Sequence, residues 1–278
     1  MLIYFSKLQG LGNDFMIIDF INQYFLLNKK LINYLSNRNL GVGFDQLLLV
    51  EKHNNQKFDF FYRIFNANGI EVENCGNGAR CLAKFLFEKR LTKKKIIHVE
   101  TYGGHLILYI NNNNLISVNM GTPLFKGFKK IKTNISKFKV LNLFIVSIGN
   151  PHAILIISNI NTIPINILGN FIENNLFITE KTNVGFMQII TPSLIKLRVF
   201  ERGVGGETKA CGTGACAAVS MGIKLGYLNR NKSIKVILTG GKLKINWLGG
   251  LSNPLYMSGY VKQVFDGSIY LNLTNYSY

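Results

Sequence analysis

The sequence predicts an α+β fold of two pseudo-symmetric domains, each a mostly antiparallel β-sheet wrapped around a central helix. Three observations predict it. Five short blocks recur in the same order in the two halves of the chain. Segments rich in Ile, Phe, Val and Tyr, separated by Gly and Asn, are typical of strands and turns. A stretch with helical spacing follows each of two Cys-Gly-x-Gly sequences, at 75–78 and 211–214.

The repeated blocks are each short, but their common order is improbable by chance. They pair residues 12–18 with 149–155, 42–48 with 184–190, 63–66 with 198–201, 75–79 with 211–215, and 103–108 with 240–245. The two Cys-Gly-x-Gly sequences are therefore equivalent, and we expect them to face each other across a pseudo-two-fold axis.

The elements follow from local pattern. Short apolar runs bounded by Gly and Asn predict strands at 59–65, 96–101, 105–110, 115–120, 143–148, 153–157, 194–200, 234–238 and 243–247. Apolar residues at helical spacing predict helices at 29–38, 79–89 and 215–225.

Composition limits the classes of partner. The net charge of +18 raises nucleic acid as a candidate. The basic residues are scattered, however, and no aromatic residues interleave the densest cluster, at 93–95. Abundant Lys, Asn and Ile favour drift toward AT-rich codons as the source of the charge. No apolar run reaches the roughly 18 residues of a membrane span, and the N-terminus does not resemble a secretory signal. We therefore expect a cytoplasmic protein with neither a nucleic-acid nor a membrane partner.

The cysteines fit neither a zinc site nor a disulfide framework, because their spacings are not C-x2-C and a cytoplasm is reducing. Cys75 and Cys211 stand where a Gly-rich turn enters a helix. The positive end of the helix dipole lowers the pKa of a thiol below its usual ~8.5. The N–H groups that follow can hold a carboxylate. They belong to Gly76, Asn77, Gly212 and Thr213.

Two facing thiols suit inversion at carbon. One thiolate removes a proton from one face, a thiol returns a proton to the other, and the N–H dipoles stabilise the carbanion-like intermediate. The alternative is that these are small core cysteines at helix starts. The duplicated context favours chemistry for Cys75 and Cys211, whereas Cys81 and Cys216, farther inside the helices, are predicted to be core residues.

Other polar residues in or beside the repeated blocks suit a zwitterionic ligand, although Asn also caps turns. The amides are Asn13, Gln46, Asn66, Asn150 and Asn183. Glu201, the counterpart of Asn66, is able to hold an ammonium, and its neighbour Arg202 a carboxylate. His152 is a candidate for tuning a thiol; the alternative is a core histidine.

Together the motifs resemble the diaminopimelate epimerase family from end to end. They lie at 10–15, 74–81, 149–152, 182–186, 201–203 and 210–216. The resemblance implies interconversion of LL- and meso-2,6-diaminoheptanedioate without a cofactor or metal, for lysine and peptidoglycan synthesis. It also implies a homodimer with its active site in the cleft between two domains, 1–119 plus 265–278, and 120–264.

Carried over residue by residue, the resemblance implies an acid/base pair of Cys75 and Cys211, with His152 and Glu201 adjusting protonation. It implies substrate contacts from Asn13, Gln46, Asn66, Gly76, Asn77, Asn150, Asn183, Glu201, Arg202, Gly212 and Thr213.

The chain departs from the family pattern at three places. Residues 203–208 contain one extra glycine, since Arg63 to Cys75 spans 12 positions and Arg198 to Cys211 spans 13. Gln9 replaces a His, and Phe265 replaces a Tyr that often contributes to the dimer interface.

Three other functions remain open from the sequence. The nearest is another two-cysteine isomerase, a proline or hydroxyproline racemase. A second is a basic nucleic-acid-binding protein that has kept an enzyme fold, and a third is an epimerase disabled by the extra glycine.

Overall fold

The computed structural model describes residues 1–278 except 74, 113–114, 136, 176–180 and 272–278. Asn74 of the first cysteine motif and the end of the predicted first domain thus lie outside the described residues. The chain divides into two compact units: unit 1 is Met1–Val118 with the chain from Gly259 onward, and unit 2 is Asn119–Ser258. The sequence placed the second division at 264/265, whereas β18, the strand that joins unit 1, begins at Lys262.

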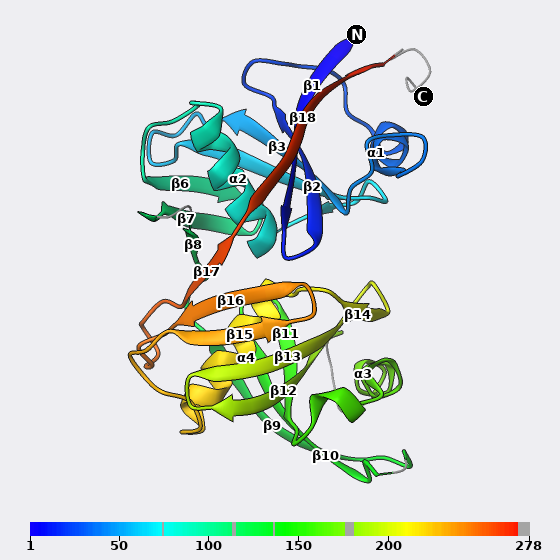
Figure 1. Ribbon diagram of the computed structural model, residues 1–278, viewed down its shortest axis with the longest axis vertical. Helices are drawn as coiled ribbons and strands as arrows, with labels where there is room; N and C mark the ends of the chain where they lie inside the picture. The colour runs from blue at the N-terminus through cyan, green and yellow to red at the C-terminus, as the bar shows by residue number, and fades with distance from the viewer. Residues whose placement is uncertain (74, 113–114, 136, 176–180, 272–278) are drawn as a thin grey trace. The chain divides into compact units, whose positions relative to one another are not determined.

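Unit 1 is one β-sheet (Figure 1). Its strands are β1 Leu2–Gly10, β2 Asn13–Asp19, β3 Gln46–Lys52, β4 Phe60–Asn66, β5 Glu71–Val72, β6 Ile96–Thr101, β7 Gly104–Ile110, β8 Leu115–Asn119 and β18 Lys262–Tyr270. The pairing order is β18-β1-β2-β3-β4-β6-β7-β8, with β5 also on β4. Only β2/β3 and β4/β6 are parallel among these pairs.

Unit 2 repeats this plan. Its strands are β9 Leu124–Lys132, β10 Val140–Ser147, β11 Pro151–Ile156, β12 Asn183–Thr191, β13 Leu194–Glu201, β14 Gly206–Thr208, β15 Ile234–Leu238, β16 Gly241–Asn246 and β17 Tyr256–Tyr260. The pairing order is β9-β10-β11-β12-β13-β15-β16-β17, with β14 also on β13. Here the parallel pairs are β11/β12 and β13/β15. The match, strand for strand, confirms the predicted duplication and the mostly antiparallel sheets.

One predicted block pairing is wrong. The sequence aligned 42–48 with 184–190 through a shared Val-Gly-Phe. In the structure Phe15 pairs with Gln46 across β2/β3, and His152 pairs with Asn183 across β11/β12. Since residues 12–18 correspond to 149–155, Gln46 corresponds to Asn183. The Val-Gly-Phe triplet precedes β3 in unit 1 but lies inside β12 in unit 2, so its recurrence has no structural meaning.

The block at 63–66 and 198–201 is confirmed by a shared ion pair. Arg63 donates from Nε to Glu71 at 2.7 Å, and Arg198 donates from Nε to Glu207 at 2.7 Å. Both arginines lie on the longer strand of a short hairpin and both glutamates on its partner. This pair fixes the register of β4/β5 and of β13/β14 in the same way.

Each sheet is wrapped around one helix, α2 Gly76–Glu88 in unit 1 and α4 Gly212–Lys224 in unit 2. Helix α2 contacts β1, β2, β3 and β7, and α4 contacts β10–β13 and β16. Both helices were predicted to begin later, at 79 and 215, but they begin directly after the cysteines. Helix α4 is buried almost all round, which fits its run of Ala and other small residues.

Two further helices cover the other face of the sheets. Helix α1, Lys29–Ser36, contacts β3, and confirms the predicted helix at 29–38. Helix α3, Ile165–Glu173, contacts β12–β14 and follows the 3₁₀ turn η2, Ile160–Thr162; neither was predicted. Within the described residues, no helix is long and apolar enough to cross a membrane.

The extra glycine is absorbed in the turn between β13 and β14. Residues 67–70 separate Asn66 from Glu71, and residues 202–206, one residue longer, separate Glu201 from Glu207. Gly203 and Gly205 both adopt positive φ there, a conformation that glycine enters without steric cost. From Glu207 to Cys211 the spacing equals that from Glu71 to Cys75. The insertion therefore leaves the number of residues between Glu207 and Cys211 unchanged.

Candidate functional site

Cys75 is the N-cap of helix α2. Its backbone is extended (φ −145°, ψ 106°), and its Sγ accepts a hydrogen bond from Gly78 N at 3.3 Å. The thiol is partly exposed. A sulfur that accepts from the first turn of a helix lies at the positive end of the helix dipole, which favours the thiolate.

Cys211 is the N-cap of helix α4 in the same geometry. Its φ is −116° and its ψ 108°, and its Sγ accepts from Gly214 N at 3.4 Å. It is 6% exposed. Its Sγ also lies 3.5 Å from Oγ1 of the Thr213 hydroxyl. The two thiols are thus held alike by backbone, and the motif residue two positions on differs, Asn77 in one and Thr213 in the other.

The second glycine of each Cys-Gly-x-Gly lies close to a strand. A Cβ at Gly78 would overlap the hydroxyl of the buried Tyr62, so packing excludes a side chain there. A Cβ at Gly214 would lie 3.2 Å from Val199 Cγ2 and 3.3 Å from Cys211 Sγ, which is a tight contact.

Cys81 and Cys216 are fully buried inside α2 and α4, as predicted for core residues, and none of the four cysteines forms a disulfide. Burial raises the pKa of the Cys81 thiol well above its usual range. Cys81 is therefore a neutral thiol, and only the N-cap sulfurs have access to helix N–H groups.

In unit 1 the predicted amides form hydrogen-bonded pairs at strand ends. Gln46 Nε2 donates to Asn66 Oδ1 at 2.9 Å across β3/β4. Asn77 Nδ2 donates to Asn13 Oδ1 at 3.5 Å, which links the first turn of α2 to the β1–β2 turn. Asn77 is buried, whereas the other three are partly exposed.

In unit 2 the predicted residues form a second group. Asn183, 1% exposed, accepts from Arg202 N at 3.0 Å and donates from Nδ2 to Pro151 O at 3.4 Å. The guanidinium of Arg202 donates to Lys181 O at 3.1 Å, and its side chain is exposed. Burial raises the pKa of Glu201, and the Thr208 hydroxyl and the charge of Arg202 oppose this rise.

His152 is fully buried on β11. Burial, with a smaller contribution from the positive charge of Arg202, lowers its pKa to about 3. The ring is thus neutral at physiological pH. Its Nε2 lies 3.0 Å from Asn150 Oδ1, so the ring and the amide form a hydrogen-bonded pair.

Sequence reasoning missed residues that act behind the predicted ones. Arg80, fully buried in α2, donates to Asn77, and Asp45 accepts from Asn13. Tyr62, fully buried against the start of α2, is beside Cys75. Arg80 and Tyr62 lie at positions that the spacing of apolar residues places in the core, and nothing in the sequence indicates that a polar side chain at such a position contacts the site. Asp45 precedes a strand, and only its position beside Gln46 could have indicated it.

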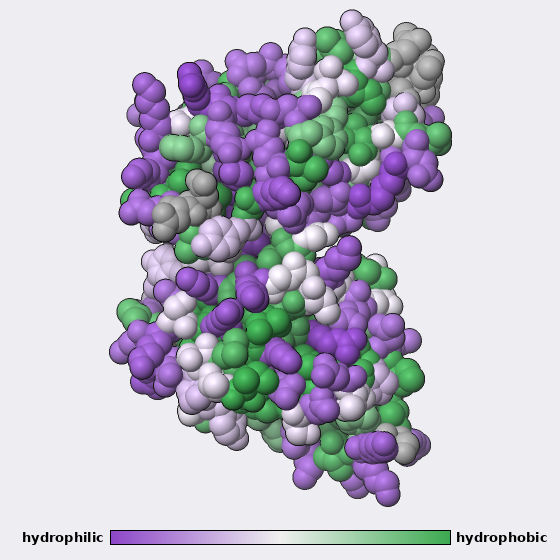
Figure 2. Space-filling view, in the orientation of Figure 1, coloured by the Kyte–Doolittle hydropathy of each residue, from purple (hydrophilic) through white to green (hydrophobic). Residues whose placement is uncertain are grey.

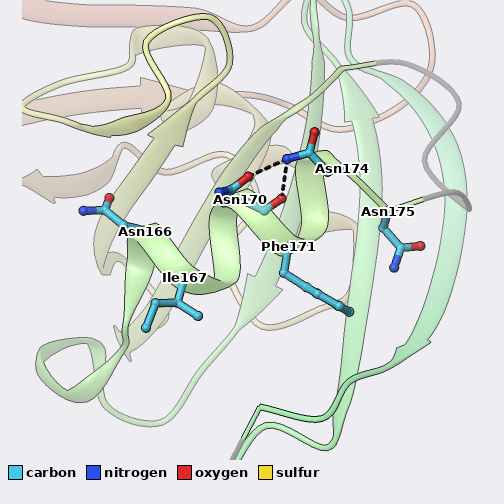
Figure 3. Close-up of a pocket in the computed structure, with 6 residues that line it drawn as sticks. All are labelled: Asn166, Ile167, Asn170, Phe171, Asn174 and Asn175. Atoms are coloured by element: carbon cyan, nitrogen blue, oxygen red, sulfur yellow. Dashed lines mark hydrogen bonds between the residues drawn. The ribbon is translucent and has the colours of Figure 1, made fainter.

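The structure joins the predicted residues in small groups within each unit: Gln46 with Asn66, Asn13 with Asn77, Asn150 with His152, and Asn183 with Arg202. A separate hollow of about 670 Å³ lies on α3 (Figure 3). It is lined by Asn166, Ile167, Asn170, Phe171, Asn174 and Asn175. It contains no predicted site residue and no acid, base or nucleophile. In the described part of the chain, no three His, Cys, Asp or Glu are placed to hold a metal ion.

Comparison with known proteins identifies the family. The family model described as diaminopimelate epimerase matches residues 5–126 and 144–264. The diaminopimelate epimerase of Blochmanniella pennsylvanica (strain BPEN) is 48% identical over 97% of this chain and 99% of its own length. That of Blochmanniella floridana is 46% identical over 96% of this chain and 99% of its own length.

The fold is also found in more distant proteins. A hydroxyproline epimerase from Agrobacterium vitis, solved with bound trans-4-hydroxy-L-proline, superposes with a TM-score of 0.74 over 98% of this chain and 93% of that one, at 12% identity. This likeness concerns the fold alone, whereas the sequence matches run nearly from end to end. The chain belongs to the diaminopimelate epimerase family.

Proposed function

We propose that this protein interconverts LL- and meso-2,6-diaminoheptanedioate, for lysine and peptidoglycan synthesis, by proton transfer at one α-carbon without a cofactor. The observation that carries the proposal is the pair of thiols held as N-caps in matching geometry, one in each unit. The family membership supplies the substrate. Two equivalent sulfurs that accept from helix N–H groups, in a duplicated context, support a paired chemical role.

In the proposed reaction, one sulfur starts as thiolate and the other as thiol. The thiolate removes the α-proton from one face and becomes a thiol, while the other thiol donates its proton to the opposite face and becomes a thiolate. The electron pair left at the α-carbon is delocalised into the carboxylate. The N–H groups of Gly76, Asn77, Gly212 and Thr213 stabilise that charge, because helix N-termini bind anions.

The remaining residues are proposed to bind the polar groups of the substrate. Glu201, partly buried and close to Arg202, binds an ammonium, and Arg202 binds a carboxylate. The amide side chains of Asn13, Gln46, Asn66, Asn150 and Asn183 supply the other donors and acceptors. His152 is a neutral residue at the pH of the reaction. It therefore acts through its hydrogen bond to Asn150 and not by carrying charge.

We further propose a homodimer formed along β1 and β18 in the cytoplasm. Tyr4, Val264, Phe265 and Tyr270 are exposed on these two paired strands. Exposed apolar side chains on neighbouring strands favour association. Hydrophilic residues dominate much of the visible face of unit 1 (Figure 2). The proposed reaction needs both thiols unoxidised, a state that a reducing cytoplasm favours.

The direct test is incubation of the purified protein with LL-diaminopimelate and, separately, with L-proline in heavy water. Deuterium at the α-carbon of diaminopimelate, with appearance of the meso isomer, is the expected result. Deuterium in proline alone would make the protein a proline racemase. Exchange in neither substrate would favour the inactive enzyme, although the extra glycine leaves the spacing to Cys211 intact.

A further inference from the structure

A chain of hydrogen bonds in unit 1 runs from a buried arginine to an exposed one. Arg80 Nη2 donates to Asn77 Oδ1 at 2.7 Å, and Asn77 Nδ2 donates to Asn13 Oδ1 at 3.5 Å. Asn13 Nδ2 donates to Asp45 Oδ2 at 2.9 Å. Asp45 Oδ1 accepts from Arg38 at 2.9 Å. From Arg80 to Asp45 each group donates to the next, and at Asp45 the direction reverses because Arg38 also donates to it.

The charged residues fix the two amides between them. Guanidinium groups only donate and carboxylates only accept, so Arg80 requires the oxygen of Asn77, and Asp45 requires the nitrogen of Asn13. A flip of Asn13 would set its oxygen against the Asp45 carboxylate. Asn13 is thereby held with its oxygen available, and an amide oxygen has a second lone pair beyond the one that Asn77 uses.

The equivalent asparagine of unit 2 has a neutral partner instead. Asn150 corresponds to Asn13 by the repeat, and its Oδ1 lies 3.0 Å from His152 Nε2. A neutral imidazole nitrogen either donates or accepts, so His152 does not fix the amide of Asn150 as Asp45 fixes that of Asn13. The counterparts of Arg80, Asn77 and Asp45 are Cys216, Thr213 and Thr182, so unit 2 lacks the chain altogether.

We infer that Asp45 is a positioning residue that makes Asn13 a fixed hydrogen-bond acceptor for a substrate ammonium. The inference rests on the proposed function. It accounts for how one of two duplicated asparagines is reserved for the ammonium of an amino-acid group. In this view the pseudo-symmetry is broken by the residues behind the asparagines and not by the asparagines themselves.

The test is a swap. Asp45→Asn releases the Asn13 amide to flip, so KM for LL-diaminopimelate rises about tenfold while kcat changes less than about threefold. In the double variant Asn13→Asp with Asp45→Asn, residue 13 only accepts and residue 45 donates to it. The acceptor is restored, and KM returns to within about threefold of the parent.

The matched control is Asp19→Asn. Asp19 also accepts from backbone and amide N–H groups, but at the other end of β2, so KM and kcat stay at the parental values. A parental KM in Asp45→Asn, or a swap no better than Asp45→Asn alone, overturns the inference. A purely structural role of Asp45 predicts that second result.

A readout without substrate separates this inference from the proposed function. The side-chain amide protons of Asn13, identified in NMR spectra by their loss in Asn13→Asp, are expected to exchange slowly in the parent and quickly in Asp45→Asn. Unprotected amide protons in the parent contradict the inference even if the enzyme is active. Protected protons in a protein that does not act on diaminopimelate leave the orientation intact and reject only the function.

Discussion

At the scale of single residues, each N-cap cysteine has a structural task beside the proposed chemical one. Cys75 and Cys211 both satisfy a backbone N–H that the first turn of a helix leaves without a helical partner. Serine serves the same purpose well, whereas alanine does not and costs about 1 kcal/mol of stability. A serine substitution therefore removes the thiol while keeping the helix start, which makes it the cleaner probe of chemistry.

His152 makes the stability of the folded protein depend on pH. Its pKa is about 3 in the folded protein because of burial and the charge of Arg202, against 6.5 for an ordinary histidine. Below pH 6.5 the unfolded chain binds a proton that the folded one does not, until the pH nears 3. The stability is thus fully present above pH 6.5 and declines by about 1.4 kcal/mol per pH unit below it.

The corresponding prediction compares the parent with His152→Gln in urea unfolding at pH 7 and pH 5. Between these values the parent is expected to lose about 2 kcal/mol more unfolding free energy than the variant, because glutamine does not titrate. Equal losses in the two proteins would mean that His152 is solvated or charged in the folded state.

At the scale of elements, α3 depends on one glycine. A Cβ at Gly169 would lie 2.5 Å from Phe200 Cβ, so α3 packs directly on β13 at this point. Alanine favours a helix over glycine by about 1 kcal/mol, but overpacking of a core costs typically 1–3 kcal/mol. We expect the packing term to be the larger, because Phe200 is buried and the overlap is with its Cβ as well as its ring.

Gly169→Ala is therefore expected to lower the urea midpoint, with a loss of roughly 1–2 kcal/mol. Gly206→Ala is the matched control: among the described residues no heavy atom lies within 4 Å of its Cβ position, and its φ is not positive. A midpoint that rises in Gly169→Ala, as helix propensity alone requires, would show that α3 relaxes away from β13.

The same glycine explains a limit of sequence reasoning. Helix α3 was missed because Gly169 and several asparagines interrupt its apolar spacing, and because packing on Phe200, which the sequence does not show, stabilises it. By contrast, α2 and α4 were predicted, because apolar residues recur at helical spacing within each segment and this spacing is visible in the sequence. Their true starts were missed because the cysteines cap the helices, and cysteine is not among the usual N-cap residues.

The candidate site shows the same division. Cys75 and Cys211 were found from duplicated glycine-rich motifs, which are visible in sequence. Asp45 and Arg80 were not, because their importance lies in bonds to Asn13 and Asn77 that depend on the folding of distant segments together. The wrong alignment of 42–48 with 184–190 has a similar cause, since strand register and not residue identity decides equivalence.

At the scale of the whole molecule, the duplication gives two copies of one arrangement, and the copies differ in the residues around it. Both units present a thiol at a helix N-terminus. Unit 1 places Tyr62 beside its thiol and also contains the Asp45–Arg80 chain. Unit 2 places the Thr213 hydroxyl beside its thiol and also contains His152 and Glu201. In the proposed two-base reaction one sulfur starts charged and the other neutral, and the roles exchange in the reverse direction.

The measurement that tests this account most directly is the position of deuterium early in the reaction of LL-diaminopimelate in heavy water. With two bases, the meso product gains deuterium at the inverted carbon, while the remaining LL substrate gains none, because the thiol that took its proton returns that same proton. Cys75→Ser and Cys211→Ser each lose inversion by a factor of about 10² or more, with unfolding midpoints near the parent. Equal deuterium in substrate and product from the start, or full inversion in either serine variant, would contradict the account.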